Sequence, residues 1–323
     1  MNLQELAKEI EQYDSFLLLS HIRPDGDAIG SQLALGDALE RLGKTVIYYN
    51  EDGCPSNLTF LKGSEKVQQS TPEPVNVDAV IALDTAKHDR VGPNSLKAGK
   101  QVPVWFNIDH HPSNPEYGTV NYIDGTSPAT GQIIYELVQA GGWKLGEQGQ
   151  MAAYVGISTD TGSFQYPATT SKTYRIAADI IDDGLNVGAV NSATYGEQPY
   201  RKVQLLKHLL NTLEVEHNGL IAHWFLTAQV KEELQLQPED SEDLIDIIRS
   251  IEGVKVALFF EEISSDSNEI RVSMRSKTPT INASEICQSF GGGGHALAAG
   301  IRMDGPLVTA RDQVIAKIIE VAK

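Results

Sequence analysis

The sequence predicts an α/β protein in which a doubly wound, mostly parallel sheet is followed by a second, smaller α/β domain. Strand-like apolar runs alternate with helix-like runs between residues 17 and 165, as is typical of parallel strands joined by helices. Several of these runs end in aspartate or histidine. Another series of strand-like runs starts after about residue 215. We therefore assign residues 1–190 to a first domain, 191–214 to a helical connector and 215–323 to a second domain.

The elements of the first domain follow from the spacing of its apolar residues. Continuous apolar runs bounded by turn residues or polar ends predict strands. These runs cover residues 16–19, 45–49, 77–84 and 102–109. Apolar residues that recur with helical spacing predict helices. These stretches cover residues 1–10, 33–42, 131–138, 148–155 and about 173–191.

In the second domain, strand-like runs cover residues 220–226, 254–260 and 270–275. An acidic stretch at 238–248 predicts the start of a helix between the first two of these strands. A helical run at 283–290 precedes four consecutive glycines.

The composition is that of an ordinary globular protein. The 323 residues are 41% apolar and 21% charged, which is enough for two domains with a core each. Because no apolar run approaches the roughly 20 residues of a membrane span, we expect no membrane partner. Cys54 and Cys287 lie far apart without the spacing of a metal site, so we expect a reducing, cytoplasmic location.

The formal net charge of −17 argues against binding of long nucleic acids, which requires a basic surface that replaces counterions. It is compatible with a small phosphorylated substrate that metal ions and a few arginines hold locally.

The segment between the first strand and the first long helix carries His21, Asp25 and Asp27. The two carboxylates repel one another unless a positive charge lies between them, and a divalent metal ion is the simplest source of that charge. Taken alone, the segment could equally be a polar turn that caps the following helix.

Three later segments add ligands of the same kind and favour the metal interpretation. The candidate ligands are four aspartates and two histidines: His21, Asp25, Asp27, Asp84, His110 and Asp160. Oxygen and imidazole ligands suit Mn²⁺, with Mg²⁺, Co²⁺ or Zn²⁺ as alternatives. Six protein ligands are too many for one catalytic ion, but they suit two ions about 3.5–4 Å apart.

In order along the chain, these segments resemble the signatures of the DHH phosphoesterase superfamily. The matching motifs are His21-x-x-x-Asp25-x-Asp27, Asp84, Asp109-His110-His111 and Asp160. The tail from Gly291 to Gly300 is similar to the signature of the accessory domain called DHHA1. Together they resemble the subfamily of bifunctional oligoribonucleases (nano-RNases) and pAp phosphatases of the NrnA type. The fold, the preference for Mn²⁺ and the substrates of that subfamily are what this resemblance implies.

The resemblance also divides the six ligands between two ions. One ion would take His21 and Asp25, the other Asp27, His110 and Asp160, and Asp84 would bridge both. A hydroxide between the ions would then be the nucleophile.

Two neighbours of the ligands are implied catalytic residues. His111 is similar to the family's non-ligand histidine, which contacts the scissile phosphate or aids proton transfer. Asp109 would orient a ligand histidine, although it could also be a strand-end carboxylate without a role.

The glycines and the histidine that follows them are candidate substrate-binding residues: Gly291, Gly292, Gly293, Gly294 and His295. Glycines let a phosphate or base approach the backbone amides, whereas the alternative is a simple turn that ends the preceding helix.

Further candidates for substrate binding are basic. Arg271, Ser273, Arg275 and Lys277 share one face of a predicted strand, because side chains alternate along strands. Arginine offers a bidentate fork for a terminal phosphate, but this face could instead be a solvated surface. Arg90 is a further candidate because it follows Asp84 closely.

The predicted function is hydrolysis of very short oligoribonucleotides to mononucleotides and of 3′-phosphoadenosine 5′-phosphate (pAp) to AMP and phosphate. One alternative is a phosphodiesterase for linear or cyclic dinucleotides (pApA or cyclic di-AMP). A family II-type pyrophosphatase shares the metal motifs but does not explain the glycine–histidine tail. A catalytically inert nucleotide-binding regulatory module is the alternative from another class. The oligomeric state is left open, with a homodimer as one option.

Overall fold

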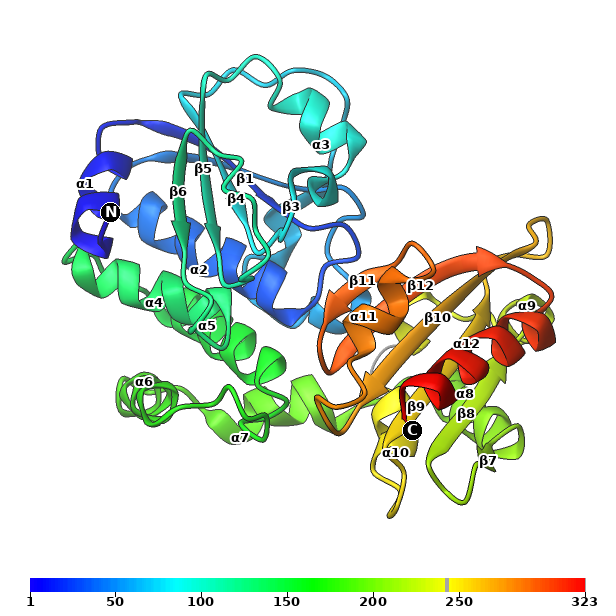
Figure 1. Ribbon diagram of the computed structural model, residues 1–323. Coiled ribbons are helices and arrows are strands. Elements are labelled where there is room, and N and C mark those ends of the chain that lie inside the picture. Colours follow the sequence, from blue (N-terminus) through cyan, green and yellow to red (C-terminus); the bar gives the residue numbers. More distant parts are fainter. Residues whose placement is uncertain (242–243, 323) are drawn as a thin grey trace. The chain divides into compact units, whose positions relative to one another are not determined.

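The computed structural model describes residues 1–241 and 244–322. They form two compact units, the first spanning Met1–Glu197 and the second beginning at Gln198 (Figure 1). This boundary falls inside the segment predicted as a connector. The π-helical turn η4 (Ser192–Gly196) ends the first unit, whereas helix α8 (Tyr200–Asn211) packs into the second unit through Leu205 and Leu209.

The sheet of the first unit is parallel, with strand order β3-β2-β1-β4-β5-β6. Its strands are β1 (Ser15–Ser20), β2 (Thr45–Asn50), β3 (Val67–Gln69), β4 (Ala79–Leu83), β5 (Val104–Asp109) and β6 (Val120–Ile123). The order of the strands reverses at β1, which lies between β2 and β4. Ligand sites of doubly wound sheets lie at the carboxyl ends of the strands at such a reversal.

Helices cover both faces of this sheet. The helices are α1 (Leu3–Ile10), α2 (Gly26–Arg41), α3 (Pro93–Ala98), α4 (Thr130–Ala140), α5 (Glu147–Asp160), α6 (Ser171–Asp182) and α7 (Val187–Asn191), with the 3₁₀ turns η1 (Ser56–Leu58), η2 (Ser64–Lys66) and η3 (His88–Val91). Leu18 packs toward α2 and α4, whereas Leu17 and Leu19 pack toward Val91 and Ala98 on the opposite face. The prediction of a doubly wound parallel sheet is therefore confirmed.

Helices α2 and α5 approach one another very closely beside the carboxyl ends of the strands. A Cβ atom on Gly30 of α2 would lie only 2.5 Å from the carbonyl oxygen of Ala152 in α5, so this contact requires glycine. The close packing brings the first turn of α2 near the last turn of α5.

The second unit is a smaller α/β domain, as predicted, with a mixed sheet of order β11-β12-β10-β9-β8-β7. Its strands are β7 (Glu214–Glu216), β8 (Ile221–Leu226), β9 (Val256–Glu262), β10 (Glu269–Ser276), β11 (Gly293–His295) and β12 (Ala298–Asp304), of which β8 and β9 pair in parallel and the other neighbours antiparallel. The remaining elements are α9 (Ala228–Glu233), η5 (Pro238–Ser241), α10 (Ile245–Arg249), α11 (Ala283–Gln288) and α12 (Leu307–Val321).

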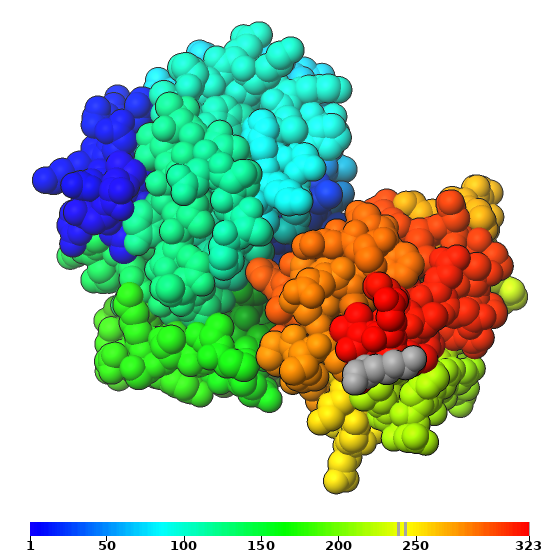
Figure 2. Space-filling model, in the orientation of Figure 1, coloured from blue at the N-terminus to red at the C-terminus, as the bar shows by residue number. Residues whose placement is uncertain are grey.

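Helices cover both faces of the second sheet as well. Phe260 and Val272 face α11 and α12, whereas Trp224 and Phe259 face α8 and α10. Helix α12, red in Figure 2, lies at the surface of this unit. Two residues of the acidic stretch predicted to start a helix, 242 and 243, lie outside the described residues. Within the described part of the chain, no helix has both the length and the apolar composition of a membrane span.

Candidate metal centre

The six predicted ligands form two adjoining groups. One group contains His21, Asp25 and Asp84, and the other contains Asp27, His110 and Asp160. Within each group, the candidate ligand atoms all lie within 4.8 Å of one another. His21 directly follows β1, Asp84 follows β4 and His110 follows β5, so the centre lies at the reversal of strand order. Asp27 and Asp160 come from the ends of helices α2 and α5 and not from strand ends.

Asp84 lies between the two groups. Its Oδ2 is 3.5 Å from Nε2 of His21, and its Oδ1 is 3.4 Å from Nε2 of His110. The backbone of Asp84 is left-handed (φ +58°), which is unfavourable for a residue with a Cβ and is characteristic of functional sites. One oxygen of this buried carboxylate therefore faces each group.

Backbone carbonyls orient both ligand histidines. Nδ1 of His21 lies 2.8 Å from the carbonyl oxygen of Ile22, and Nδ1 of His110 lies 3.3 Å from that of Ser127. A carbonyl partner at Nδ1 leaves Nε2 as the nitrogen that can bind a metal. In both rings Nε2 is the atom that faces Asp84.

Backbone amides hold the two aspartates of the first motif. Asp25 caps α2, and its Oδ1 accepts hydrogen bonds from the amides of Asp27 and Ala28, at 3.0 Å each. Asp27 is 1% exposed and accepts hydrogen bonds from the amides of Thr130 (2.6 Å) and Gly131 (2.7 Å) at the start of α4. The contribution of α4 was missed in the sequence, where no local pattern connects it to Asp27.

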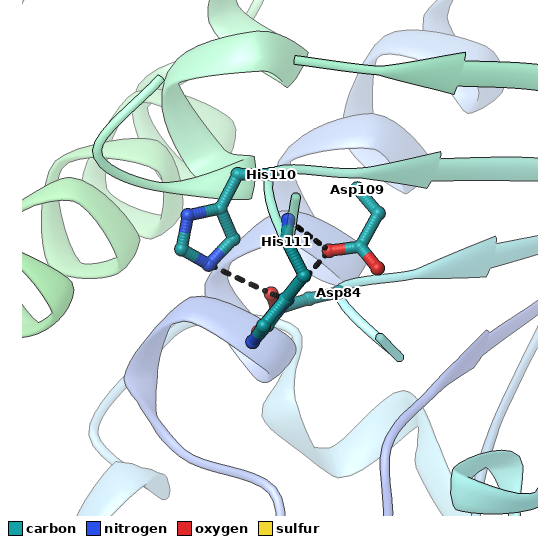
Figure 3. A group of neighbouring side chains, drawn as sticks. All are labelled: Asp84, Asp109, His110 and His111. Atoms are coloured by element: carbon teal, nitrogen blue, oxygen red, sulfur yellow. Dashed lines mark hydrogen bonds and ion pairs between the residues drawn. The ribbon is translucent and has the colours of Figure 1, made fainter. Parts of the chain in front are cut away.

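Asp109 contacts His111 and not a ligand histidine, which differs from the sequence expectation. Its Oδ1 lies 2.7 Å from Nδ1 of His111 and also accepts a hydrogen bond from the backbone amide of that residue (Figure 3). Its Oδ2 accepts hydrogen bonds from the amide of Ala86 and the side chain of Asn114. The fully buried Asp109 therefore fixes the orientation of the His111 ring.

The carboxylates of the centre affect one another's protonation. Burial, together with the carboxylates of Asp84 and Asp160, raises the pKa of Asp27 well above its usual value. Burial also raises the pKa of Asp160 to about 7; His110 opposes this shift and Asp84 adds to it. Burial would raise the pKa of Asp84 too, but its contacts with His110 and His21 outweigh burial and lower it.

The histidines respond in the opposite sense. Burial alone would lower the pKa of His21, but the carboxylates of Asp25 and Asp84 outweigh it and raise the pKa to about 10. The pKa of His110 is raised for the same reason, mainly by Asp84. A site that takes up protons in this way requires positive charge, and its oxygen and imidazole donors fit divalent cations.

The predicted basic residues lie on and beside strand β10. Arg271, Ser273 and Arg275 share one half-buried face of the strand, as their alternation predicts. Arg271 forms an ion pair with Glu261 at 2.7 Å, whereas the contact recorded for Arg275 is with the carbonyl oxygen of Met274. Lys277 follows the strand and donates a hydrogen bond to the carbonyl oxygen of Ile251.

Arg90 lies in the first unit, beside the metal centre. Its carbonyl oxygen accepts a hydrogen bond from the amide of Ile22, the residue after His21.

The glycine segment is only partly a loop. Gly293, Gly294 and His295 form the edge strand β11, which pairs with β12. Gly291 and Gly294 have positive φ angles of +81° and +143°, which glycine adopts without strain. A Cβ atom on Gly292 would collide with the carbonyl of Gly300 in β12. The glycines thus serve both a tight turn and close strand pairing.

Cross-strand pairing places the glycine segment beside Arg275. Gly300 lies opposite both Ser273 of β10 and Gly293 of β11. Ala298 likewise lies opposite both Arg275 and His295. Directly paired residues point to the same face, so a row of small residues separates Arg275 from His295.

Comparisons with known proteins agree with this architecture. The sequence model of the DHH family, N-terminal domain, matches residues 15–159, and that of the DHHA1 domain matches residues 224–323. Two curated relatives share the name bifunctional oligoribonuclease and PAP phosphatase NrnA. The one from Bacillus subtilis (strain 168) is 31% identical, over 92% of this chain and 91% of its own length. The one from Thermus thermophilus is 30% identical, over 99% and 92%.

Solved structures share the fold. An exopolyphosphatase-related protein from Bacteroides fragilis matches with a TM-score of 0.90 and 23% identity, over 99% of this chain and 97% of that one. The exonuclease RecJ from Thermus thermophilus, solved in complex with Mn²⁺, matches with a TM-score of 0.56 and 13% identity, over 99% of this chain and 54% of that one. From the sequence matches, this chain belongs to the DHH family of phosphoesterases and carries a DHHA1 domain after its DHH domain.

Proposed function

We propose that this chain hydrolyses very short oligoribonucleotides to mononucleotides and pAp to AMP and phosphate, with two divalent metal ions. The observation that carries the proposal is the position of Asp84, whose two carboxylate oxygens face two separate groups of ligands. The curated relatives that are named oligoribonuclease and PAP phosphatase support this choice of substrates.

The six ligands would hold the ions in the two groups described above. His21 and Asp25 would bind one, Asp27, His110 and Asp160 the other, and Asp84 both. Bound divalent cations supply positive charge opposite a phosphate and lower the pKa of a water molecule that they bind. We propose Mn²⁺ as the preferred ion because the donors mix carboxylate oxygens with imidazole, with Mg²⁺ and Co²⁺ as alternatives.

His111 is our proposed proton donor to the leaving oxygen. Its Nδ1 faces Asp109 at 2.7 Å, so the imidazolium form is stabilised and the ring orientation is fixed. Asp109 would act through His111, as a positioning residue.

We propose that the second unit recognises the rest of the substrate through Arg275, Ser273, His295 and the glycines. Arg275 suits a terminal phosphate, since an arginine offers two parallel donors. The small residues between Arg275 and His295 leave room for a flat base or a sugar. Arg271 and Lys277 have protein partners and would contribute mainly through the field of their charges. Arg90 would contribute charge beside the metals.

The test is a substrate panel with the purified full-length chain. It contains pAp, pApA, cyclic di-AMP, pyrophosphate and RNAs of two to twenty-four nucleotides, each with Mn²⁺ and with Mg²⁺. We expect release of phosphate from pAp and of mononucleotides from the shortest RNAs, fastest with Mn²⁺. Turnover of pyrophosphate alone, or of dinucleotides without pAp, would replace the proposal with one of its rivals. No turnover of any substrate by a metal-loaded chain would favour an inert binding module.

We further propose that the chain works in the cytoplasm. Cys54 and Cys287 are both free thiols, which suits a reducing compartment. A homodimer stays a prediction, to be measured by light scattering.

A further inference from the structure

A buried threonine outside the predicted ligand set contacts both groups of the metal centre. Thr130 is the first residue of α4 and is fully buried. The residue before it, Ala129, offers no side-chain cap to the helix. The first amides of α4 therefore need acceptors from elsewhere in the unit.

Asp27 supplies those acceptors. The amide of Thr130 donates to Oδ2 of Asp27 at 2.6 Å, and the amide of Gly131 donates to Oδ1 at 2.7 Å. The hydroxyl of Thr130 donates to Oδ1 of Asp84 at 3.1 Å. Thr130 thus binds one carboxylate from each group through two different donors.

The backbone around Asp27 leaves little room for adjustment. A Cβ atom on Gly131 would lie 3.0 Å from Oδ1 of Asp27, and one on Gly156 of α5 would lie 2.9 Å from it. Helices α4 and α5 therefore approach this carboxylate as closely as glycine allows. The position of Thr130 relative to Asp27 is consequently fixed by packing.

Asp84 depends on side-chain donors for the orientation of its carboxylate. Its amide is used by β5, because it donates to the carbonyl oxygen of Ile108. Oδ1 is the oxygen that faces His110, and it also accepts the hydrogen bond from the Thr130 hydroxyl. Removal of that hydroxyl would free the carboxylate to rotate about χ2.

We infer that Thr130 is a positioning residue that fixes the carboxylates of Asp27 and Asp84 relative to one another and thereby sets the spacing of the two metal ions. This inference rests on the two-ion site of the proposed function. It adds a residue that binds no metal to the determinants of metal affinity. Partners of this kind typically change metal affinity by about 10- to 100-fold when removed.

The test compares Thr130→Val, which removes the hydroxyl at nearly constant volume, with Thr130→Ser, which keeps it. Mn²⁺ is titrated into each metal-free, full-length protein, with calorimetry for affinity and electron paramagnetic resonance for the magnetic coupling of a metal pair. For Thr130→Val we expect affinity for at least one ion to fall by about 10- to 100-fold and the coupled signal to weaken. Thr130→Ser should stay close to the wild-type protein.

Thr173→Val is the matched control. Thr173 is also fully buried and donates its hydroxyl to Gln132 of α4, but it does not contact the metal ligands. This variant should lose stability and keep its Mn²⁺ affinity. Thr130→Ala removes the critical hydroxyl without steric risk and carries the same expectation, should the valine variant fail to fold.

Wild-type Mn²⁺ affinity and coupling in both Thr130→Val and Thr130→Ala would overturn the inference. Equal losses in the serine and valine variants would overturn it too, because the hydroxyl would then not be the cause. The readout is independent of turnover: a wild-type chain that binds paired Mn²⁺ but hydrolyses none of the panel contradicts the proposed function alone.

Discussion

The metal centre of the first unit and the β10 face of the second unit use charge in opposite ways. The metal centre gathers acidic groups in a buried place, where Asp27 is 1% and Asp84 is 3% exposed. The β10 face carries cationic and small side chains that are half-buried. Buried like charges are stable only with strong partners, whereas a half-exposed arginine loses little of its hydration. The difference indicates that chemistry resides in the first unit and recognition in the second.

The largest effect should come from Asp84, because both groups depend on it. Asp84→Ala should lower turnover of pAp by about 10³-fold or more, since losing one ion forfeits several kcal/mol of transition-state stabilisation. Steady-state assays at saturating Mn²⁺ measure this. His208→Ala on α8 is the control and should be nearly silent. Near-normal turnover in Asp84→Ala would refute the bridging role.

Loss of recognition should be smaller and should depend on the substrate. Arg275→Ala and His295→Ala should lower kcat/KM on pAp by about 100-fold, or roughly 2.7 kcal/mol. On a small aryl phosphate, which lacks the remote groups, both variants should stay near wild type. Asp27→Ala should lose both activities.

Arg302→Ala is the matched control for this comparison. Arg302 lies on β12 opposite Arg271 and pairs with Glu269, so its loss should change little. If His295→Ala loses both activities equally while it keeps its metals, His295 takes part in the chemistry and the division of roles is wrong.

The length of RNA substrates gives a graded test of the acidic surface. With a net charge of −17, phosphates beyond the first few meet repulsion and no basic stripe. Rates should therefore fall steadily from RNAs of two nucleotides to RNAs of twenty-four. Equal rates on both, at matched ionic strength, would show that recognition extends far beyond Arg275 and His295.

The smallest effect concerns stability against pH in the metal-free protein. The pKa of His21 rises from 6.5 unfolded to about 10 folded, since Asp25 and Asp84 outweigh the effect of burial. Its contribution to stability is therefore complete below pH 6.5 and is lost as the pH rises toward 10. Deprotonation of Asp160, with a raised pKa, acts in the same direction.

Thermal melts measure this dependence. With a chelator present, the melting temperature should fall between pH 6.5 and pH 10. With Mn²⁺ the fall should be much smaller, because the cations replace the protons. A melting temperature that falls equally with and without Mn²⁺ would place the titrating groups elsewhere.

The sequence predicted the elements whose signals are local. Strand β1, strand β4 and the alternation on β10 all follow from runs of residues that are close in the chain. The grouping of ligands was predictable through the resemblance, and the structure assembles the same two groups. The roles of the individual site residues stay predictions.

What the sequence did not reveal depends on contacts between distant segments. Asp27 and Thr130 are 103 residues apart, and neither has a pattern that points to the other. The short strand β11 was expected as a loop, because its pairing partner β12 lies beyond a turn and glycine does not favour strands. Asp109 was expected beside a ligand histidine, but strand geometry turns it toward His111.

The most direct test of a two-metal centre is the number of Mn²⁺ ions that the chain binds. Equilibrium dialysis of the metal-free, full-length protein should give two ions per chain, with a coupled paramagnetic signal. In Asp84→Ala that signal should disappear, whereas Arg275→Ala should keep both ions. One ion per chain in the wild-type protein, or loss of an ion in Arg275→Ala, would contradict this account.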